Sequence, residues 1–572
     1  MKRSSKSQRK KTERGKAVAS SRPKDLRREI MREPSGSSEA VFFPRDCRIA
    51  AIAIILIALF LIFFRLDQRL LWVDEAETAL LARNVLVYGI PKAYDGKTLV
   101  SQEVGHEFGS DYIWRWTPWL DKYVTAGSFA LIGQSTFSAR LPFAILGLLS
   151  VISMYPLALI LFRDRWVGIF SMAFLLLAVP FLLHVRQCRY YSFVILGSIW
   201  AVYFFIRILE EKRGATVGLA AAMTVLFHSN NLSFLATGIA LAPCLFVFKV
   251  DRAALYRLAL ATLIVVVFNG PWAYFFLFRK AEETAHPFFS NLSFYLETTN
   301  RYTFPLAAVV MFLGICWYVG RKRFPISSGD WRSFIGLIVM ASVYIVVLSI
   351  GPWSYYRYTI GLLPICAALL AFMSWNILKW NRLVGVLFTI AFLFTAVFHQ
   401  ISASLFEARS YSASVRTAGR SFPVCDRFLP LGNYLYELVK PFDGPMDNLV
   451  KYLLENGRPG DRILITYGDL IVKFYTKYEV RGGLSGEDLR GWVIPEWVIS
   501  RSFFRYGDRP ALKADADKMR SWISTLPAKY KTVATPWPDL AWDDIPEPEL
   551  HWFRPREDGA KMKIYRRAVD KP

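Results

Sequence analysis

Charge and cysteine are the two features that this sequence has in short supply. Only 20% of its 572 residues are charged, whereas 54% are hydrophobic, and a soluble protein would carry more charge and fewer long apolar runs. Its six cysteines are scattered and form no C-x-x-C pair, which argues against a disulfide framework or a zinc site. Runs of about 20 apolar residues recur between residues 48 and 400, the length needed to cross a bilayer. The sequence therefore predicts a polytopic α-helical membrane protein.

Positive charge is plentiful, but its position argues against a nucleic-acid partner. The net charge is +24, and residues 1–48 hold fifteen Lys and Arg against six Asp and Glu in a serine-rich segment. Such a segment cannot bury a core, so residues 1–47 are predicted to form a disordered tail. Much of the remaining excess lies in short loops between spans, where basic residues mark the cytoplasmic side. We predict a cytoplasmic N-terminus, no nucleic-acid binding, and a first span that is not cleaved.

Residues 48–400 are predicted to form the transmembrane domain. The predicted spans, eleven in all, are 48–64, 137–162, 166–183, 192–209, 215–228, 231–249, 257–278, 303–319, 332–350, 358–375 and 383–399. With this assignment every inward-facing loop is basic, as the positive-inside rule requires.

A long first external loop, residues 65–135, follows the first span. Within it, residues 74–88 have helical periodicity and end at Gly89-Ile90-Pro91. Residues 119–131 are apolar but short, and we predict a helix that lies along the membrane interface. Counting them as a span would place all the basic loops outside.

Residues 401–572 lose the membrane pattern and are predicted to form an external, periplasmic α/β domain. Residues 447–455 have the pattern of an amphipathic helix, and residues 462–467 have the pattern of a strand. An odd number of spans places this domain opposite the cytoplasmic N-terminus. The whole is predicted to be a multi-pass protein of the inner (plasma) membrane.

Three acids, Asp74, Glu75 and Glu77, stand just after the first span. A carboxylate in hydrocarbon is costly, so this stretch should face water at the membrane rim. The predicted topology brings further polar residues to the same outer face: Asp111, Arg186, Arg189, Tyr190, Tyr191, Arg357 and Tyr358. Chemistry, if there is any, is predicted on the outside.

Four motifs in a fixed order resemble those of the GT-C glycosyltransferases. They are Asp74-Glu75-Ala76 followed by Gly89, Pro91 and Asp95-Gly96; Arg140-Leu141-Pro142; residues 186–192; and Arg357-Tyr358 ahead of Pro364. The closer resemblance is to the protein O-mannosyltransferase and aminoarabinose–lipid A transferase branch, and to bacterial transferases that modify lipopolysaccharide. It covers residues 70–370 approximately and leaves out the C-terminal domain.

The resemblance implies an integral-membrane hexosyl- or pentosyltransferase. Such an enzyme moves a sugar from a polyprenyl-phosphate donor to a lipid, glycan or protein acceptor on the external face, with inversion. One carboxylate must activate the acceptor hydroxyl, and cations must hold the phosphate. Asp74 is the predicted base, and Glu75 is predicted to orient it or to bind the sugar. Arg189, Arg357 and Arg186 are predicted to bind the donor phosphate, and Tyr190, Tyr191 and Tyr358 the sugar.

Two departures from the family pattern bear on the mechanism. Some relatives carry a second acid where this chain has the cationic turn 186–192, which puts a metal-assisted or two-acid mechanism in doubt. Asp111 is the residue that could replace it; a divalent metal is possible but not indicated. The Trp-Trp-Asp signature of oligosaccharyltransferases is absent, which disfavours transfer of whole oligosaccharides.

Simpler interpretations stand beside these. Asp74 and Glu77 also fit a helix capping box, and the arginines also fit anchors for anionic membrane lipids. The main alternative function is a transporter or flippase of lipid-linked substrates. Transporters place polar or helix-breaking residues in mid-span and are often built from repeats, whereas no repeat is evident here. A non-catalytic envelope protein is a third possibility.

Overall fold

The computed structural model describes most of the chain after the N-terminal tail. The described residues are 45–103, 105–277, 288–320, 326–351, 354–406, 430–442, 444–482, 495–501, 513–540, 545–548, 550–555 and 560–568. The predicted tail, residues 1–47, lies almost wholly outside them.

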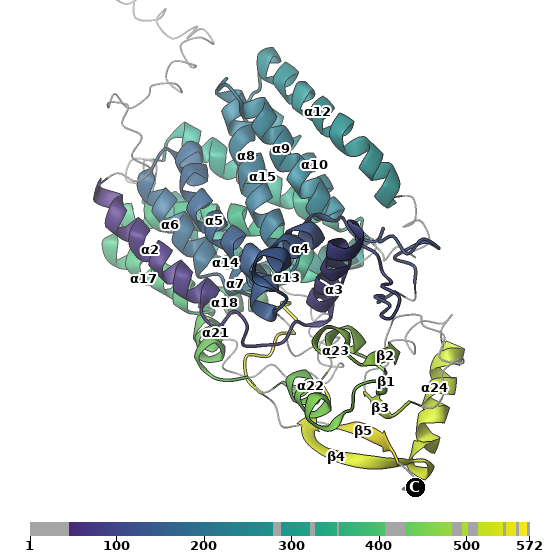
Figure 1. The fold of residues 1–572 in the computed structure, drawn as a ribbon. Helices are drawn as coiled ribbons and strands as arrows, with labels where there is room; N and C mark the ends of the chain where they lie inside the picture. The colour runs from purple at the N-terminus through teal and green to yellow at the C-terminus, as the bar shows by residue number, and fades with distance from the viewer. Residues whose placement is uncertain are drawn as a thin grey trace, which may run out of the picture.

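A bundle of apolar helices forms the larger part of the molecule (Figure 1). Its first half contains α2 (Arg45–Phe63), α5 (Thr136–Phe162), α6 (Arg165–Leu176), α7 (Val179–Val185), α8 (Tyr191–Leu209), α9 (Ala215–Ser229), α10 (Asn231–Leu241) and α11 (Cys244–Val247). Its second half contains α12 (Arg252–Leu277), α13 (Phe288–Tyr302), α14 (Leu306–Val319), α15 (Ser328–Leu348), the short 3-10 helix η2 (Tyr356–Leu362), α16 (Leu363–Trp380), α17 (Arg382–Phe394) and α18 (Val397–Phe406).

The described helices support a multi-pass membrane protein with fewer unbroken spans than predicted. Six are long and apolar enough to cross a bilayer, and three sharply bent helix pairs raise that number to nine if each pair is one span. Two shorter apolar helices, Ala215–Ser229 and Asn231–Val247, fall at the two remaining predicted spans. Eleven spans thus remain a prediction, because five of the segments are broken or short.

Two helices of the first external loop form where the sequence predicts them. Helix α3 runs over Val73–Tyr88 and ends at Gly89, whose positive φ of 74° is the left-handed conformation that glycine adopts readily. Helix α4 runs over Leu120–Ile132 and, at 13 residues, is too short to cross the bilayer. Both lie between the bundle and the C-terminal domain (Figure 1).

The predicted capping of α3 is wrong by two residues. The helix begins at Val73, so Trp72 is its N-cap and Glu75, not Glu77, stands at the third helical position. The Glu75 carboxylate accepts the backbone N–H of Trp72 at 3.3 Å. Asp74 and Glu77 are therefore free of a capping role.

A mixed five-stranded sheet confirms the α/β character of the C-terminal region. Its strands are β1 (Arg462–Ile465), β2 (Glu479–Gly482), β3 (Trp497–Ser500), β4 (Tyr530–Pro538) and β5 (Lys561–Arg567), in the spatial order β2-β1-β3-β5-β4. β1 pairs in parallel with β2 and β3, and the remaining pairs are antiparallel. The helices of this region are α21 (Pro430–Val439), α22 (Pro445–Asn456), α23 (Asp469–Tyr475), α24 (Lys513–Thr525) and the 3-10 turn η5 (Leu526–Ala528).

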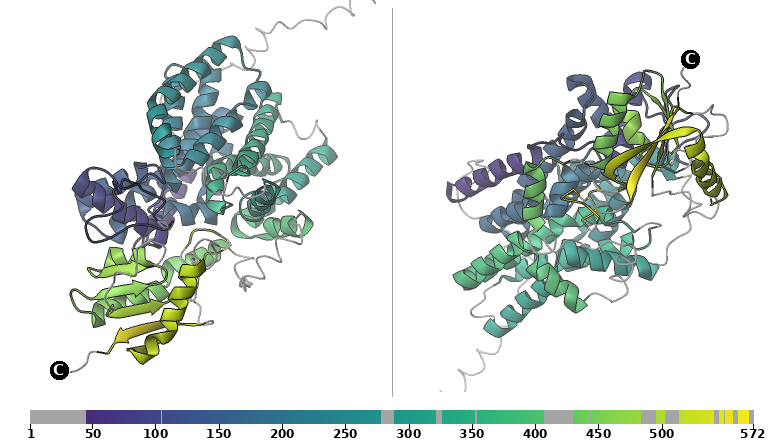
Figure 2. Two further views of the ribbon diagram at one scale, coloured as in Figure 1. Left: turned by 90° about the vertical axis from the view of Figure 1, so that its right-hand side faces the viewer. Right: turned by 90° about the horizontal axis from the view of Figure 1, so that it is seen from below.

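The C-terminal region shares its core with the first external loop. Helix α23 packs on α3, and their apolar side chains belong to one buried cluster. Arg83 of α3 lies over the ring of Phe474 at 4.1 Å and donates to the Phe474 carbonyl at 2.7 Å. The left view in Figure 2 shows this region against one end of the bundle.

Helix α21 packs instead with the membrane helices. Leu431, Tyr434 and Leu438 belong to the core of the bundle, and the Tyr434 hydroxyl donates to the carbonyl of Leu61 at 2.7 Å. We therefore propose that the sheet-containing domain begins near residue 444 rather than at residue 401.

Candidate active site

Asp74 lies where three distant segments meet. Its Oδ2 accepts hydrogen bonds from Nη1 of Arg357 at 2.8 Å and from Nη2 of Arg189 at 3.4 Å. Its Oδ1 accepts a hydrogen bond from the side-chain amide of Gln102 at 3.2 Å. The side chain is 12% exposed. The sequence-based prediction brings Asp74, Arg189 and Arg357 to one external site, and in the structure both arginines contact Asp74.

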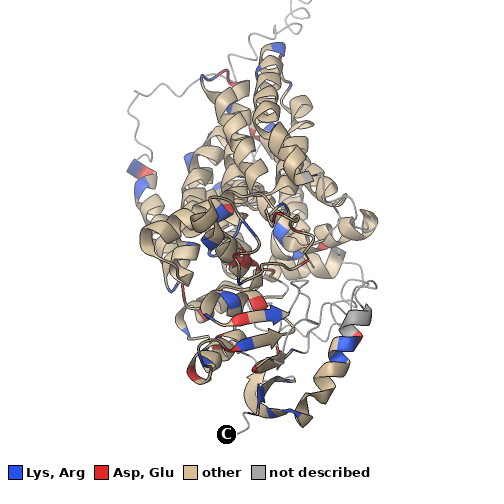
Figure 3. Ribbon diagram, turned by 45° about the vertical axis from the view of Figure 1, so that its right-hand side comes forward, with Lys and Arg blue, Asp and Glu red and all other residues tan. Residues whose placement is uncertain are grey.

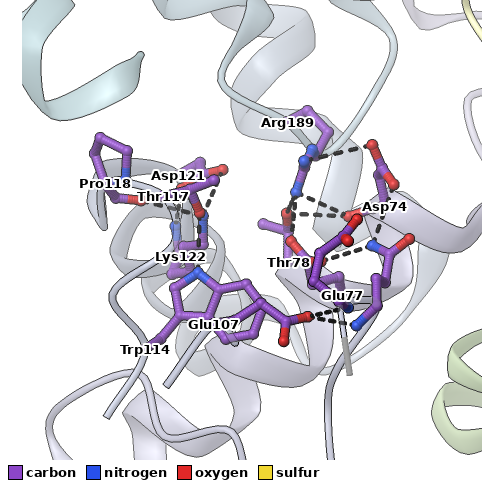
Figure 4. A network of polar contacts seen from close by, with 12 residues as sticks. Asp74, Glu77, Thr78, Glu107, Trp114, Thr117, Pro118, Asp121, Lys122 and Arg189 are labelled. Carbon is purple, nitrogen blue, oxygen red and sulfur yellow. Dashed lines mark hydrogen bonds and ion pairs between the residues drawn. The ribbon is translucent and has the colours of Figure 1, made fainter. Parts of the chain in front are cut away.

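Arg189 joins Asp74 to a second acid on the same face of α3. Residues three and four apart share a helix face, so Asp74, Glu77 and Thr78 all point toward it. Its Nη1 donates to Glu77 at 2.9 Å, to Thr78 at 3.1 Å and to the Asp74 carbonyl at 3.2 Å (Figure 4). Burial alone lowers the pKa of Arg189, but the two carboxylates raise it well above its ordinary value. Arg189 is therefore charged and already engaged by acids.

Arg357 joins Asp74 to an acid of the C-terminal domain. The Glu547 carboxylate accepts the backbone N–H of Arg357 at 3.1 Å, and its other oxygen lies 3.6 Å from Nε. The guanidinium lies over the ring of Tyr355 at 4.3 Å. Among the described residues, the hydrogen bonds of the Arg357 guanidinium include none from Nη2. Arg357 is thus the arginine with a donor still available for a phosphate.

The polar groups form a row of alternating charge: Glu77, Arg189, Asp74, Arg357 and Glu547. Burial raises the pKa of Glu77 even though Arg189 opposes this. The row contains three acids and two arginines. Charged residues are sparse along the bundle helices and gather toward the junction with the C-terminal domain (Figure 3).

Gln102 is a site residue that sequence reasoning missed. Its amide donates to both Asp74 and Glu77, the latter at 2.6 Å. The loop that carries it is folded around the buried Glu107 carboxylate, which accepts from Ser101 and the backbone of Glu103, each at 2.8 Å. Burial raises the pKa of Glu107 to about 7. No sequence pattern marks Gln102, because its partners are set by the path of this loop.

Glu75 lies beneath the site rather than in it, which argues against sugar binding, one of its two predicted roles. Its side chain is 0% exposed, and Arg140 grips it with Nε at 2.9 Å and Nη2 at 2.6 Å. The backbone N–H of Cys188 donates to the same carboxylate at 2.7 Å. With these bonds and that from Trp72, Glu75 has no exposed atom for a sugar. It positions α3 instead.

Arg186 is also directed elsewhere. Its guanidinium donates to four carbonyl groups at the end of α2, those of Leu61, Ile62, Phe64 and Arg65, at 2.9–3.2 Å. It therefore caps the first span, a favourable place for a cation at a helix C-terminus. A role in phosphate binding does not fit this geometry.

The predicted sugar-binding tyrosines are mostly part of the core. Tyr190 and Tyr191 are buried, their rings pack together at 4.7 Å, and Tyr191 also packs on His184 at 4.8 Å. Their faces are thus occupied by protein. Tyr358 is half-buried beside Tyr355, with 6.0 Å between ring centres, and is the better placed of the three.

Asp111 is not brought to the Asp74 group. Its carboxylate is 44% exposed and is held by Arg115, with Nη1 to Oδ1 at 2.7 Å. That bond holds the pKa of Asp111 well below its ordinary value.

A buried ion pair, Asp121 with Lys122 at 2.9 Å, lies close to Arg189 and Glu77 (Figure 4). Among the described residues, no three His, Cys, Asp or Glu side chains are grouped so that they could hold a metal ion.

Comparison with known proteins agrees with this architecture. Residues 117–274 match the family model described as dolichyl-phosphate-mannose-protein mannosyltransferase. No curated protein sequence matches the chain.

Two of the similar solved structures are of ArnT from Cupriavidus metallidurans. The form bound to undecaprenyl phosphate is 15% identical, and the match covers 91% of this chain and 98% of that chain with a TM-score of 0.53. The apo form is 14% identical, with the same coverage and TM-score. An oligosaccharyltransferase from Archaeoglobus fulgidus is 11% identical over 78% of this chain and 65% of its own, with a TM-score of 0.45.

These findings confirm the predicted resemblance to the GT-C glycosyltransferases and the GT-C-like fold. The family match contains Arg140, Arg186 and Arg189, whereas Asp74, Arg357 and Glu547 lie outside it. The arrangement of the site therefore depends on the structure.

Proposed function

We propose that the chain is an integral-membrane glycosyltransferase that moves a sugar from a polyprenyl-phosphate donor to a lipid, glycan or protein acceptor on the external face. The observation that carries the proposal is the Asp74 carboxylate held between Arg189 and Arg357 at a partly open rim. The family match and the shared fold support this function over a transporter. The sparse charge along the bundle helices also gives no support to a transport path (Figure 3).

The chemistry needs one base and one cation at the reacting centre. Asp74 takes the proton of the acceptor hydroxyl, and the acceptor oxygen bonds to the anomeric carbon of the sugar. The bond from that carbon to the phosphate oxygen breaks, and its electron pair leaves with the polyprenyl phosphate. Arg357 stabilises the charge that the leaving phosphate gains. A single displacement of this kind inverts the anomeric carbon.

The division of labour between the two arginines follows from their partners. Arg189 uses Nη1 and Nη2 on Asp74, Glu77 and Thr78, so it fixes the base. Arg357 contacts Asp74 through Nη1 and keeps Nη2 for the donor. We propose Arg357 as the principal phosphate ligand and Arg189 as a residue that orients Asp74.

Removing the Arg357 guanidinium should weaken donor binding more than replacing it with an amine. We expect Arg357→Ala to raise the KM for the donor about 30-fold, the loss of about 2 kcal/mol typical of a charged hydrogen bond. Arg357→Lys keeps the charge but not the planar fork, and should raise KM about fivefold. Transfer by purified protein in detergent, at varied donor concentration, measures both values.

Arg115→Ala is the matched control, because Arg115 pairs with Asp111 away from Asp74. It should leave the donor KM unchanged. Equal KM values for Arg357→Ala and Arg357→Lys would contradict the phosphate contact and indicate packing or lipid anchoring.

Cells provide the test of the proposed reaction itself. Deleting the protein should remove one sugar from an envelope lipid, glycan or protein, as seen by mass spectrometry of envelope fractions. Re-expressing the wild-type chain should restore it, and Asp74→Asn should not. An unchanged set of envelope glycans in the deletion would refute the proposal.

A further inference from the structure

A short segment near the C-terminus folds into a tight hook. We call residues 545–548 together with residues 550–553 the C-terminal hook. The Glu547 carbonyl accepts the backbone N–H groups of Leu550 and His551, each at 2.9 Å, and a His551 ring nitrogen lies 2.9 Å from the carbonyl of Ile545. Prolines on both sides of Glu547 restrict the backbone. The hook therefore presents the Glu547 side chain in a fixed direction.

Ion pairs fasten the C-terminal hook to the membrane domain. Arg69, just after the first span, donates to the carbonyl of Trp552 at 2.6 Å and pairs with Glu437 at 3.1 Å. Glu437 also accepts the other ring nitrogen of His551 at 2.8 Å. Burial alone would raise the pKa of Glu437, but Arg69 and His551 lower it to about 2. The ionised Glu437 thus ties the hook to the rim of the bundle.

The fastened hook places Glu547 inside the donor site. Its side chain is 1% exposed and faces the guanidinium of Arg357. Other ionisable groups that act on it or feel its charge come from several elements: Asp74, Tyr191, Tyr295 and Tyr358. Among the described residues, Oε1 makes no hydrogen bond, since 3.6 Å to Nε of Arg357 is too long for one.

The Glu547 carboxylate is buried and, within the described part of the chain, only one of its oxygens accepts a hydrogen bond, so this group can be protonated readily. Burial raises its pKa to about 7, although Arg357 and the backbone N–H groups of Tyr356 and Arg357 oppose this. The residue can therefore exist in either form at neutral pH. By contrast, both terminal nitrogens of Arg189 hold Glu77 and Asp74 in place.

A bound donor phosphate adds a negative charge to a row of side chains that already contains more acids than arginines. The row already contains three acids and two arginines, and a phosphodiester adds one negative charge beside Arg357. Like charges in a buried site repel strongly, and the repulsion is relieved when one acid takes a proton. Glu547 shares Arg357 with the incoming phosphate, so it is the acid most affected.

We propose that Glu547 belongs to the donor site and takes up a proton when the donor phosphate binds to Arg357. The inference depends on the proposed donor class. Without the donor, Glu547 is the counter-ion of Arg357; with the donor bound, the phosphate takes this role. The C-terminal domain thereby contributes a residue to donor binding.

The direction of the pH effect follows from linkage. Bound phosphate raises the pKa of Glu547 further, so binding takes up protons and weakens as the pH rises through about 7. For one proton the dissociation constant should increase roughly five- to tenfold between pH 6 and pH 8. Glu547→Gln imitates the protonated acid, and its dissociation constant should stay nearly constant over this range.

A binding measurement on the full chain tests the proposal without requiring catalysis. The probe is a polyprenyl methyl phosphodiester, whose phosphate does not titrate between pH 6 and pH 8. Its dissociation constant is measured by calorimetry in detergent for wild type, Glu547→Gln and Asp517→Asn. Asp517 is an exposed acid of α24 and provides the matched control; its variant should keep the wild-type pH dependence.

Proton uptake provides a second measurement that needs no variant. Calorimetry of the wild type at pH 7, in buffers of different ionisation enthalpy, should show an uptake of about half a proton or more per probe bound. No uptake would overturn the proposal, as would a wild-type pH dependence in Glu547→Gln, which would assign the proton to Glu77. Failure of the wild type to bind the probe at any pH would overturn the proposed donor class as well.

Discussion

Replacing Asp74 by Asn is expected to lower kcat for sugar transfer about 1,000-fold. A general base contributes typically 10²–10⁴-fold, and the amide cannot take the proton of the acceptor hydroxyl. The variant should still fold, because Arg189 remains paired with Glu77 and Arg357 remains paired with Glu547. Transfer assays on purified protein, with the melting temperature measured in parallel, check both expectations.

Asp111→Asn is the control for this experiment. Asp111 is the other acid that the sequence offered, and the structure shows it exposed and bound to Arg115. Its variant should transfer sugar at the wild-type rate. Full activity of Asp74→Asn would disprove the base assignment, and a large loss in Asp111→Asn would revive the two-acid mechanism.

Breaking the pair between Glu75 and Arg140 is expected to cause the largest loss of stability. Glu75→Ala leaves the buried Arg140 guanidinium without its counter-charge, and such a change costs roughly 3–5 kcal/mol. Arg140 would still donate to the carbonyls of Leu66, Arg69 and Leu70, but these groups carry no full negative charge. The melting temperature in detergent should fall markedly, and activity should be lost together with folded protein.

A surface ion pair of the same type gives the contrast. Asp46 and Arg165 are 2.9 Å apart but about half exposed, so Asp46→Ala should cost about 0.5 kcal/mol or less. If Glu75 instead bound the sugar, Glu75→Gln would lower activity while leaving the melting temperature unchanged. That result would contradict the structural role assigned here.

Local patterns predicted the elements of this site well. Helix α3 was predictable because its apolar spacing and Gly89 act within one helix, and basic loops fixed which span ends share a face. That reasoning brought Asp74 together with Arg189 and Arg357, which lie 115 and 283 positions away in the sequence. Membrane topology thus supplied a long-range constraint that soluble sequences lack.

The residues whose roles the sequence did not predict correctly share one physical cause, which is that the direction of a side chain depends on tertiary packing. Glu75 differs from Asp74 by one position, yet the helix turns it into the core toward Arg140. Tyr191 was predicted at the rim and is fully buried. Glu547 could not be found, because the position of the hook depends on tertiary contacts of a domain outside the family resemblance.

The packing of α23 on α3 has a consequence for biosynthesis. During translation α3 leaves the ribosome early, but Phe474, whose ring contacts Arg83 of this helix, follows 391 residues after Arg83. Domains usually fold in the order in which they are made, whereas this helix cannot complete its packing until nearly the whole chain is synthesised. The nascent protein therefore carries Asp74, the proposed base, through membrane insertion on a helix whose packing is incomplete, and the proposed site can form only after the C-terminal domain has been made.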